Sequence, residues 1–179
     1  MLHRGLRSLF LLLTGTLLLF FSCIEENDRI IKIVSTTDIH GVIFPFDYAD
    51  SRPLEASLAG VSSYLKQLRN QYEVVLLDNG DNLQGQPTVY YYNFLDTSSF
   101  HINSLAMNYM KYDAATVGNH DIEAGHAVYD RLAGEYKFPL LAANAVRKSD
   151  GKPYFKPYAV INRNDIKIAV MGLITPSVP

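Results

Sequence analysis

The hydrophobic and polar positions of this chain form short blocks that predict strands and helices in alternation. Continuous apolar blocks, rich in β-branched residues, predict strands at 30–34, 73–77, 114–117 and 140–146. Blocks with an apolar residue at every third or fourth position predict helices at 57–70, 100–112 and 122–137. This alternation predicts an α/β fold in which helices flank a mostly parallel sheet.

Capping and turn residues refine several of these elements. Ser57 is suited to cap the first helix, because its hydroxyl can accept a backbone N–H. In the second helix the spacing of apolar residues predicts four inward-facing side chains, which are Ile102, Leu105, Tyr109 and Tyr112. Gly125 and Gly134 weaken the third helix. The two apolar runs around the polar segment 162–165 predict a hairpin.

The first 23 residues differ from the rest and resemble a bacterial lipoprotein signal. A basic start precedes an apolar run at 9–21, which is shorter than the roughly 18 residues of a membrane-spanning helix. Cys23 would become the lipidated first residue, followed by an acidic tether at 24–29 and one domain at 30–179. The other interpretation is an uncleaved anchor with an incidental cysteine. Both imply export to the bacterial cell envelope, on its periplasmic or outer side.

Composition supports an ordered domain and excludes several classes of function. Of the 179 residues, 48% are hydrophobic and 19% are charged, as in a folded domain with its own core. The net charge of −2 argues against binding along a long nucleic acid, but not against a phosphate ligand held by metal ions. Because Cys23 is the only cysteine, internal disulfides and a thiolate metal site in the mature domain are excluded.

Polar side chains that suit a metal site follow three of the predicted strands. The segments are Asp38-Ile39-His40, Gly80-Asp81-Asn82 and Gly118-Asn119-His120-Asp121. The carboxyl ends of parallel strands meet at one edge of a sheet, where α/β proteins collect their functional groups. The oxygen and nitrogen donors in these segments are those of a two-metal site for phosphate chemistry.

Four of these side chains are candidate metal ligands. Residues two apart in an extended segment project to the same side, so Asp38 and His40 can bind one ion together. The carboxylate of Asp81 can bridge two ions. Asp78 is the rival ligand, although we expect it to support the loop. The amide oxygen of Asn119 would add a neutral ligand to an anionic site.

His120 is the expected catalytic residue of the third segment. Beside Asn119 it would point toward the substrate and donate a proton or a hydrogen bond to the leaving oxygen. Either Asp121 or Glu123 would orient the imidazole and raise its pKa. The alternative is a simple turn that opens a helix, but three such segments after three strands favour a metal site.

Other residues are weaker candidates. His101 and His126 are expected to be ordinary helix residues, since neither follows a predicted strand. The aromatic segment Tyr90–Phe94 is expected to pack against a neighbouring element or a partner domain. The other interpretation is that it stacks on a nucleobase, because aromatic faces accept any base.

Together the three segments resemble the signature of the calcineurin-like metallophosphoesterases. Within them the chain is similar to the N-terminal part of the secreted 5′-nucleotidase and 2′,3′-cyclic-nucleotide phosphodiesterase group. Further matching segments are Ser35–Gly41, Asp78–Gly85, Leu141–Asn144 and Gly172–Pro176. Gln84-Gly85 and Phe46-Asp47-Tyr48 favour the cyclic-phosphodiesterase and 3′-nucleotidase branch. The resemblance implies a partial α/β/β/α sandwich, incomplete at its C-terminus.

The resemblance also implies a function and a set of roles. Asp38, His40, Asp81 and Asn119 match metal ligands, with Asp81 bridging, and His120 matches the catalytic histidine. Two divalent ions (Zn, Mn, Fe or Co) about 3.5–4 Å apart would hold the phosphate of a nucleotide or cyclic nucleotide, which a metal-bound hydroxide would attack.

The resemblance implies two missing parts as well. The family completes its metal site with further histidines, including a Gly-His-x-His segment, and grips the base with a separate C-terminal domain. Neither is present in these 179 residues. The alternative to an enzyme is therefore a catalytically incompetent, truncated fragment that binds metal weakly at most.

Overall fold

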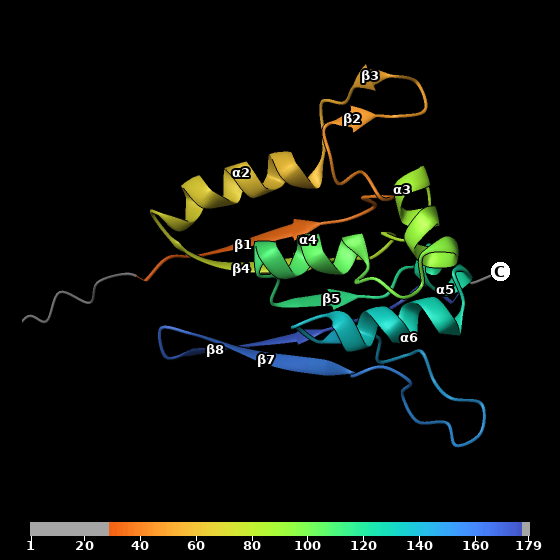
Figure 1. The fold of residues 1–179 in the computed structure, drawn as a ribbon. Coiled ribbons are helices and arrows are strands. Elements are labelled where there is room, and N and C mark those ends of the chain that lie inside the picture. Colours follow the sequence, from red (N-terminus) through yellow and green to blue (C-terminus); the bar gives the residue numbers. More distant parts are fainter. Residues whose placement is uncertain (1–28, 177–179) are drawn as a thin grey trace, which may run out of the picture.

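The structure is a computed structural model that describes residues 29–176, and its centre is a parallel sheet (Figure 1). The sheet has four strands in the order β1-β4-β5-β6, and every neighbouring pair is parallel. The strands are β1 (Ile31–Thr36), β4 (Glu73–Asp78), β5 (Ala114–Thr116) and β6 (Leu140–Leu141). The predicted α/β class with a mostly parallel sheet is confirmed.

Helices connect and cover these strands. They are α2 (Leu58–Arg69), α3 (Pro87–Tyr90), the π-helix η1 (Tyr91–Leu95), α4 (Ile102–Met110), α5 (Asn119–Glu123) and α6 (His126–Glu135). Leu65 of α2 and Met107 of α4 are in one buried cluster with Leu76 of β4, so both helices pack on the sheet. The arrowheads of β1 and β5 in Figure 1 point toward α3 and α5, so these two short helices lie near the carboxyl edge.

Two antiparallel pairs lie outside the sheet. They are β2 (Phe46–Asp47) with β3 (Arg52–Pro53), and β7 (Tyr158–Arg163) with β8 (Ile166–Met171). The predicted hairpin is therefore confirmed, with its turn at Asn164-Asp165, where both residues have positive φ. The predicted cap is confirmed as well, because the hydroxyl of Ser57 accepts a hydrogen bond from Gly60 N at 3.2 Å.

Two predicted elements are wrong in extent. The segment predicted as one helix at 122–137 contains parts of two helices, because Gly125 adopts φ 84° and interrupts the helical backbone between α5 and α6. The strand predicted at 140–146 stops after Leu141. Beyond it, Ala142 N donates to Lys156 O and Ala143 N donates to Gly172 O, so this backbone pairs with later segments instead.

The predicted inner face of the second helix is right at two of its four positions and wrong at the other two. Tyr112 is buried and Ile102 packs against the same core cluster, as predicted. Leu105 and Tyr109 are 49% and 68% exposed, while the polar Asn103 and Ser104 are fully buried. Asn103 Nδ2 donates to the hydroxyl of Tyr136 at 3.0 Å, and this hydrogen bond offsets part of the free-energy cost of burying the amide. Hydrophobic spacing therefore fails at positions 105 and 109, because the polar Asn103 and Ser104 share the buried face of α4 with Met107 and Met110.

His101 is not an ordinary helix residue but the buried N-cap of α4. Its Nδ1 accepts from Asn103 N at 3.1 Å, so Nε2 carries the proton and donates to Asn93 Oδ1 at 2.9 Å. Burial, and secondarily the charge of Arg131, lowers the pKa of His101 to about 4. Protonation of Nδ1 would break the capping bond, so the folded state requires the neutral ring.

This burial predicts a pH-dependent stability that belongs to His101. The neutral ring contributes fully to the free energy of unfolding above pH 6.5, which is the pKa of a histidine in the unfolded chain. This contribution is lost as the pH falls toward 4. The loss reaches about 3 kcal/mol in the free energy of unfolding. His101→Asn retains a capping acceptor and does not titrate, so urea unfolding of both proteins from pH 8 to pH 4.5 isolates the effect. Parallel pH profiles would contradict it.

Candidate metal centre

Three loops meet at the carboxyl edge of the sheet and are joined by backbone hydrogen bonds. Asp38 N donates to Gly80 O at 3.1 Å, and His40 N donates to Asp81 O at 2.9 Å. These bonds continue the pairing of β1 with β4 beyond the ends of both strands. The first two predicted segments are therefore held side by side by the backbone itself.

The side chains of Asp38, His40 and Asp81 converge at this edge. One donor atom from each lies within 4.8 Å of the other two. His40 Nδ1 lies 3.0 Å from Gln84 O, a carbonyl that can only accept, so Nδ1 carries the proton and Nε2 is free for a ligand. That Nε2 lies 3.9 Å from Asp38 Oδ1. Two carboxylates and one neutral imidazole are a donor set that fits a divalent transition metal.

All three of these residues have a left-handed backbone. The φ angles are 53° for Asp38, 49° for His40 and 61° for Asp81. Non-glycine residues in this region each cost on the order of 1 kcal/mol or more, and such strain gathers at functional sites. The same three residues thus combine convergence with backbone strain, which supports a site rather than a chance cluster.

The third predicted segment packs against Asp81. Asp81 Oδ1 accepts a hydrogen bond from His120 N at 3.0 Å. A Cβ on Gly118 would lie only 2.0 Å from the same oxygen, so the segment approaches this closely because residue 118 has no side chain. Asn119 lies between these two contacts, at the first position of α5. The chain on both sides of Asn119 therefore touches the carboxylate of Asp81.

Asp78, the rival ligand, points into the protein instead. Its carboxylate accepts from Thr36 Oγ1 at 2.7 Å, from Asn82 Nδ2 at 2.6 Å and from Gly80 N at 3.0 Å. Burial raises the pKa of Asp78 to about 6, although these three hydrogen bonds oppose the shift. Asp78 thus ties β1 to the loop that carries Asp81.

Asp121 is likewise a buried support of the loops. Its two carboxylate oxygens accept from four backbone N–H groups, those of Asp81, Asn82, Leu83 and Gly118, at 2.9–3.0 Å. Burial raises the pKa of Asp121 despite these bonds. With its oxygens used in this way, Asp121 holds the second and third segments together through backbone N–H groups.

Glu123 is the acid beside His120. Its Oε2 lies 2.9 Å from His120 Nδ1, and this hydrogen bond raises the pKa of His120. The bond uses Nδ1, so Nε2 of His120 is left for another partner. The imidazole centroids of His120 and His40 are 5.4 Å apart, which brings the His120–Glu123 pair next to the Asp38–His40–Asp81 cluster.

The remaining candidates lie elsewhere. His126 begins α6, and its Nδ1 lies 3.5 Å from Asp130 Oδ2 at the surface. Tyr90 and Phe94 pack ring against ring, with centroids 5.1 Å apart, and about half of each side chain is exposed. In the same segment, the ring of Tyr92 lies 5.7 Å from the ring of His101, so part of it packs against a neighbouring element as expected, and packing against a partner domain stays a prediction. Sequence reasoning also missed Gln84, which contacts both His40 and Glu123.

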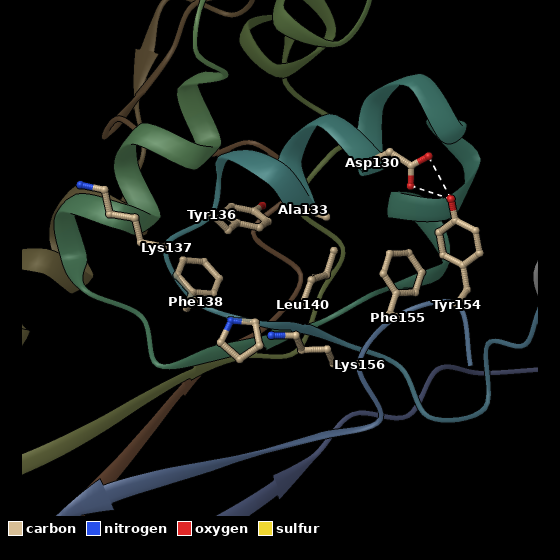
Figure 2. Close-up of a pocket in the computed structure, with 10 residues that line it drawn as sticks. Asp130, Ala133, Tyr136, Lys137, Phe138, Leu140, Tyr154, Phe155 and Lys156 are labelled. Carbon is tan, nitrogen blue, oxygen red and sulfur yellow. Dashed lines mark hydrogen bonds between the residues drawn. The ribbon is translucent and has the colours of Figure 1, made fainter. Parts of the chain in front are cut away.

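A cavity of about 490 Å³ lies away from this centre, below the C-terminal end of α6 (Figure 2). Tyr136, Phe138, Leu140 and Phe155 line it, and the Tyr154 hydroxyl donates to Asp130 at its margin. No residue of the Asp38–His40–Asp81 cluster lines this cavity. Lys137 and Lys156 line it as well, and Asp130 is the one carboxylate among its lining residues, so it offers no set of converging ligands for a metal ion.

Gly80 is expected to be indispensable for the geometry of the centre. It has φ 89°, and a Cβ there would lie 2.3 Å from the backbone nitrogen of Gly118. Gly80→Ala should therefore lower the free energy of unfolding by more than about 2 kcal/mol, measured by urea titration. Gly134→Ala in α6 is the matched control, because its Cβ meets no atom within 4 Å and it should stabilise by up to about 1 kcal/mol. Equal midpoints for Gly80→Ala and the unsubstituted chain would contradict this account.

Known proteins share both the sequence and the fold. Protein UshA of Escherichia coli strain K12 is 34% identical over 182 residues, which covers 98% of this chain and 31% of UshA. A 2′,3′-cyclic-nucleotide 2′-phosphodiesterase/3′-nucleotidase of Haemophilus influenzae is 28% identical over 166 residues, covering 86% of this chain and 25% of that protein. The crystal structure of the calcineurin-like phosphoesterase YfkN from Bacillus subtilis matches with a TM-score of 0.69 and 29% identity, over 82% of this chain and 48% of that one. A comparison with models of protein families finds no match.

The chain belongs to the calcineurin-like 5′-nucleotidase family and corresponds to the N-terminal part of its members. The resemblance drawn from the three segments is therefore confirmed. The chain spans between a quarter and a third of the length of these two curated relatives.

The predicted signal, the lipidation candidate Cys23 and most of the acidic tether lie outside the described residues. Within residues 29–176, no helix combines the length and apolar character needed to cross a bilayer.

Proposed function

We propose that this chain carries the metal-binding part of a phosphoesterase that hydrolyses nucleotide phosphoesters. The substrates would be 5′-nucleotides, or 2′,3′-cyclic nucleotides and 3′-nucleotides. The observation that carries the proposal is the convergence of Asp38, His40 and Asp81, beside the hydrogen-bonded pair His120–Glu123. The names of the relatives, which are nucleotidases and phosphodiesterases, support the substrate class.

The residues of the centre divide into two ligand groups. Asp38 and His40 would hold one divalent ion, Asp81 would lie between two ions, and Asn119 would contribute to the second. Zn, Mn, Fe and Co all suit these oxygen and nitrogen donors. Bound there, two such ions supply a water of lowered pKa and neutralise the charge on the phosphate. The free Nε2 of His40 is the nitrogen available for this purpose.

His120 would assist the leaving group. Glu123 accepts from Nδ1, which keeps Nε2 of the ring directed away from the acid and available to the departing oxygen. The pKa of His120 is raised by that bond, so a larger share of the ring is protonated near neutral pH, as proton donation requires. Asp121 would act only through the loops that it joins.

A second candidate is that this chain by itself is a weak metal-binding module without turnover. It is favoured by coverage, because the chain spans 25–31% of the two relatives described above. Four ligands shared between two ions would leave the second ion weakly held.

Under both candidates we place a signal at 1–23, a lipid anchor at Cys23, and export to the cell envelope with attachment to a membrane. A further nucleotide-binding domain would complete the enzyme.

Hydrolysis with added metal tests the proposal. The chain, and any longer natural form of it, is incubated with Mn²⁺ or Zn²⁺ and bis-p-nitrophenyl phosphate, a 2′,3′-cyclic nucleotide or a 5′-nucleotide. Metal-dependent release of product that a chelator abolishes is the expected result for the longer form. Turnover that a chelator leaves undiminished would contradict the mechanism. Turnover in the longer form alone would assign this chain the second candidate role.

A further inference from the structure

Gln84 lies between the two histidines of the centre. Its backbone oxygen accepts from His40 Nδ1 at 3.0 Å, and its side-chain Nε2 donates to Glu123 Oε2 at 3.2 Å. The same Oε2 accepts from His120 Nδ1 at 2.9 Å. One loop residue therefore contacts His40 directly and reaches His120 through Glu123.

The backbone at Gln84 is fixed by its neighbours. Gln86 N donates to His40 O at 3.1 Å, and a Cβ on Gly85 would lie 2.6 Å from that same oxygen. Gly85 has φ 127°, a backbone conformation that residues with a side chain rarely adopt. The loop therefore closes tightly around His40, while the exposed amide of Gln84 extends across to α5.

We propose that Gln84 is a positioning residue that aligns His120 through Glu123, a role that rests on the proposed function. A glutamate side chain near the surface rotates among several orientations. A second donor on Oε2 holds the carboxylate where it can accept from Nδ1 of His120. A glutamine amide donates a hydrogen bond but is neutral and does not ionise. It therefore restrains Glu123 without neutralising the charge of the Glu123 carboxylate. The result is a His120 ring with Nε2 directed to the substrate side.

The side chain and the backbone of Gln84 can be separated by mutation. Gln84→Ala removes the amide that reaches Glu123 but keeps the carbonyl that accepts from His40. We expect kcat to fall about three- to tenfold, the loss of one hydrogen bond, while KM and Mn²⁺ affinity stay unchanged. Gln67→Ala in α2 is the matched control, because it removes the same exposed amide away from the centre.

A double-mutant cycle distinguishes positioning from a direct role. If Gln84 acts through Glu123, Gln84→Ala has no effect on kcat in a Glu123→Ala background. An equal loss in both backgrounds, or a rise in KM in place of the loss in kcat, would overturn the proposal. Lower Mn²⁺ affinity would also overturn it, since it would show damage at His40.

A readout without turnover keeps this proposal separate from the proposed function. ¹⁵N NMR of the histidine rings in the metal-free protein, at a pH where they are neutral, reports which nitrogen of His120 carries the proton. Gln84→Ala should shift His120 from mainly Nδ1–H toward the Nε2–H form, while Gln67→Ala should not. An unchanged His120 signal would overturn the proposal even if the enzyme is active. Absence of hydrolysis in every form with this shift present would reject the proposed function alone.

Discussion

Asp81→Asn is expected to abolish tight metal binding by the chain. The affinity for Mn²⁺, measured by isothermal titration calorimetry, should fall by more than about 100-fold, since even partners outside the ligand shell contribute 10- to 100-fold. Asp81 is the acid that can lie between two ions, and its Oδ1 already accepts from His120 N. An amide keeps the shape of the side chain but removes the negative charge that attracts a divalent ion.

The control for Asp81→Asn is Asp165→Asn. Asp165 lies in the turn between β7 and β8, its side chain is 97% exposed, and it also has a left-handed backbone, with φ 67°. Its substitution makes the same chemical change away from the centre and should leave Mn²⁺ affinity unchanged. Equal affinities for Asp81→Asn and the unsubstituted chain would remove Asp81 from the ligand set.

His120→Ala should separate catalysis from metal binding. In the active form of the protein we expect kcat to fall by about 10²–10⁴-fold, the usual contribution of a positioned general acid. Mn²⁺ affinity should change little, because the hydrogen bond to Asp81 comes from the backbone nitrogen of residue 120 and survives the substitution. The measurement pairs steady-state kinetics on bis-p-nitrophenyl phosphate with calorimetry on the same preparations.

His126→Ala is the matched control for His120→Ala. His126 lies on α6, its side chain is 70% exposed, and its near neighbours are Asp130 and Tyr154. Its removal should leave both kcat and metal affinity unchanged. A His120→Ala protein that keeps its rate, or that loses metal together with rate, would contradict the assignment of His120 as proton donor.

The order of strands and helices was predictable because apolar periodicity reports burial directly. Apolar periodicity fails where a buried position is not hydrophobic, as on α4, whose inner face carries Asn103. Asn103 is compensated by the hydroxyl of Tyr136, a contact across 33 positions that local spacing does not encode. The division between α5 and α6 was a smaller failure. Gly125 weakens the predicted helix, but composition alone does not show that its φ is positive and that the helix ends there.

The convergence of the three segments was predictable from strand ends alone. The sequence offers both Asp121 and Glu123 as the partner of His120, and helix geometry distinguishes between them. Residues three apart in a helix face each other, so an acid at 123 meets the ring and an acid at 121 does not. The structure shows that arrangement, with Glu123 on the ring and Asp121 on four backbone N–H groups. The left-handed backbone at Asp81 could not be foreseen, because non-glycine residues seldom adopt it.

The measurement that tests the central claim most directly is anomalous X-ray scattering from crystals of this protein grown with Mn²⁺. The account predicts anomalous peaks bonded to the carboxylate of Asp81, with Asp38 and His40 Nε2 on one ion and Asn119 on the other. Well-ordered side chains at these four positions with no anomalous peak between them, or manganese bound only elsewhere, would contradict it.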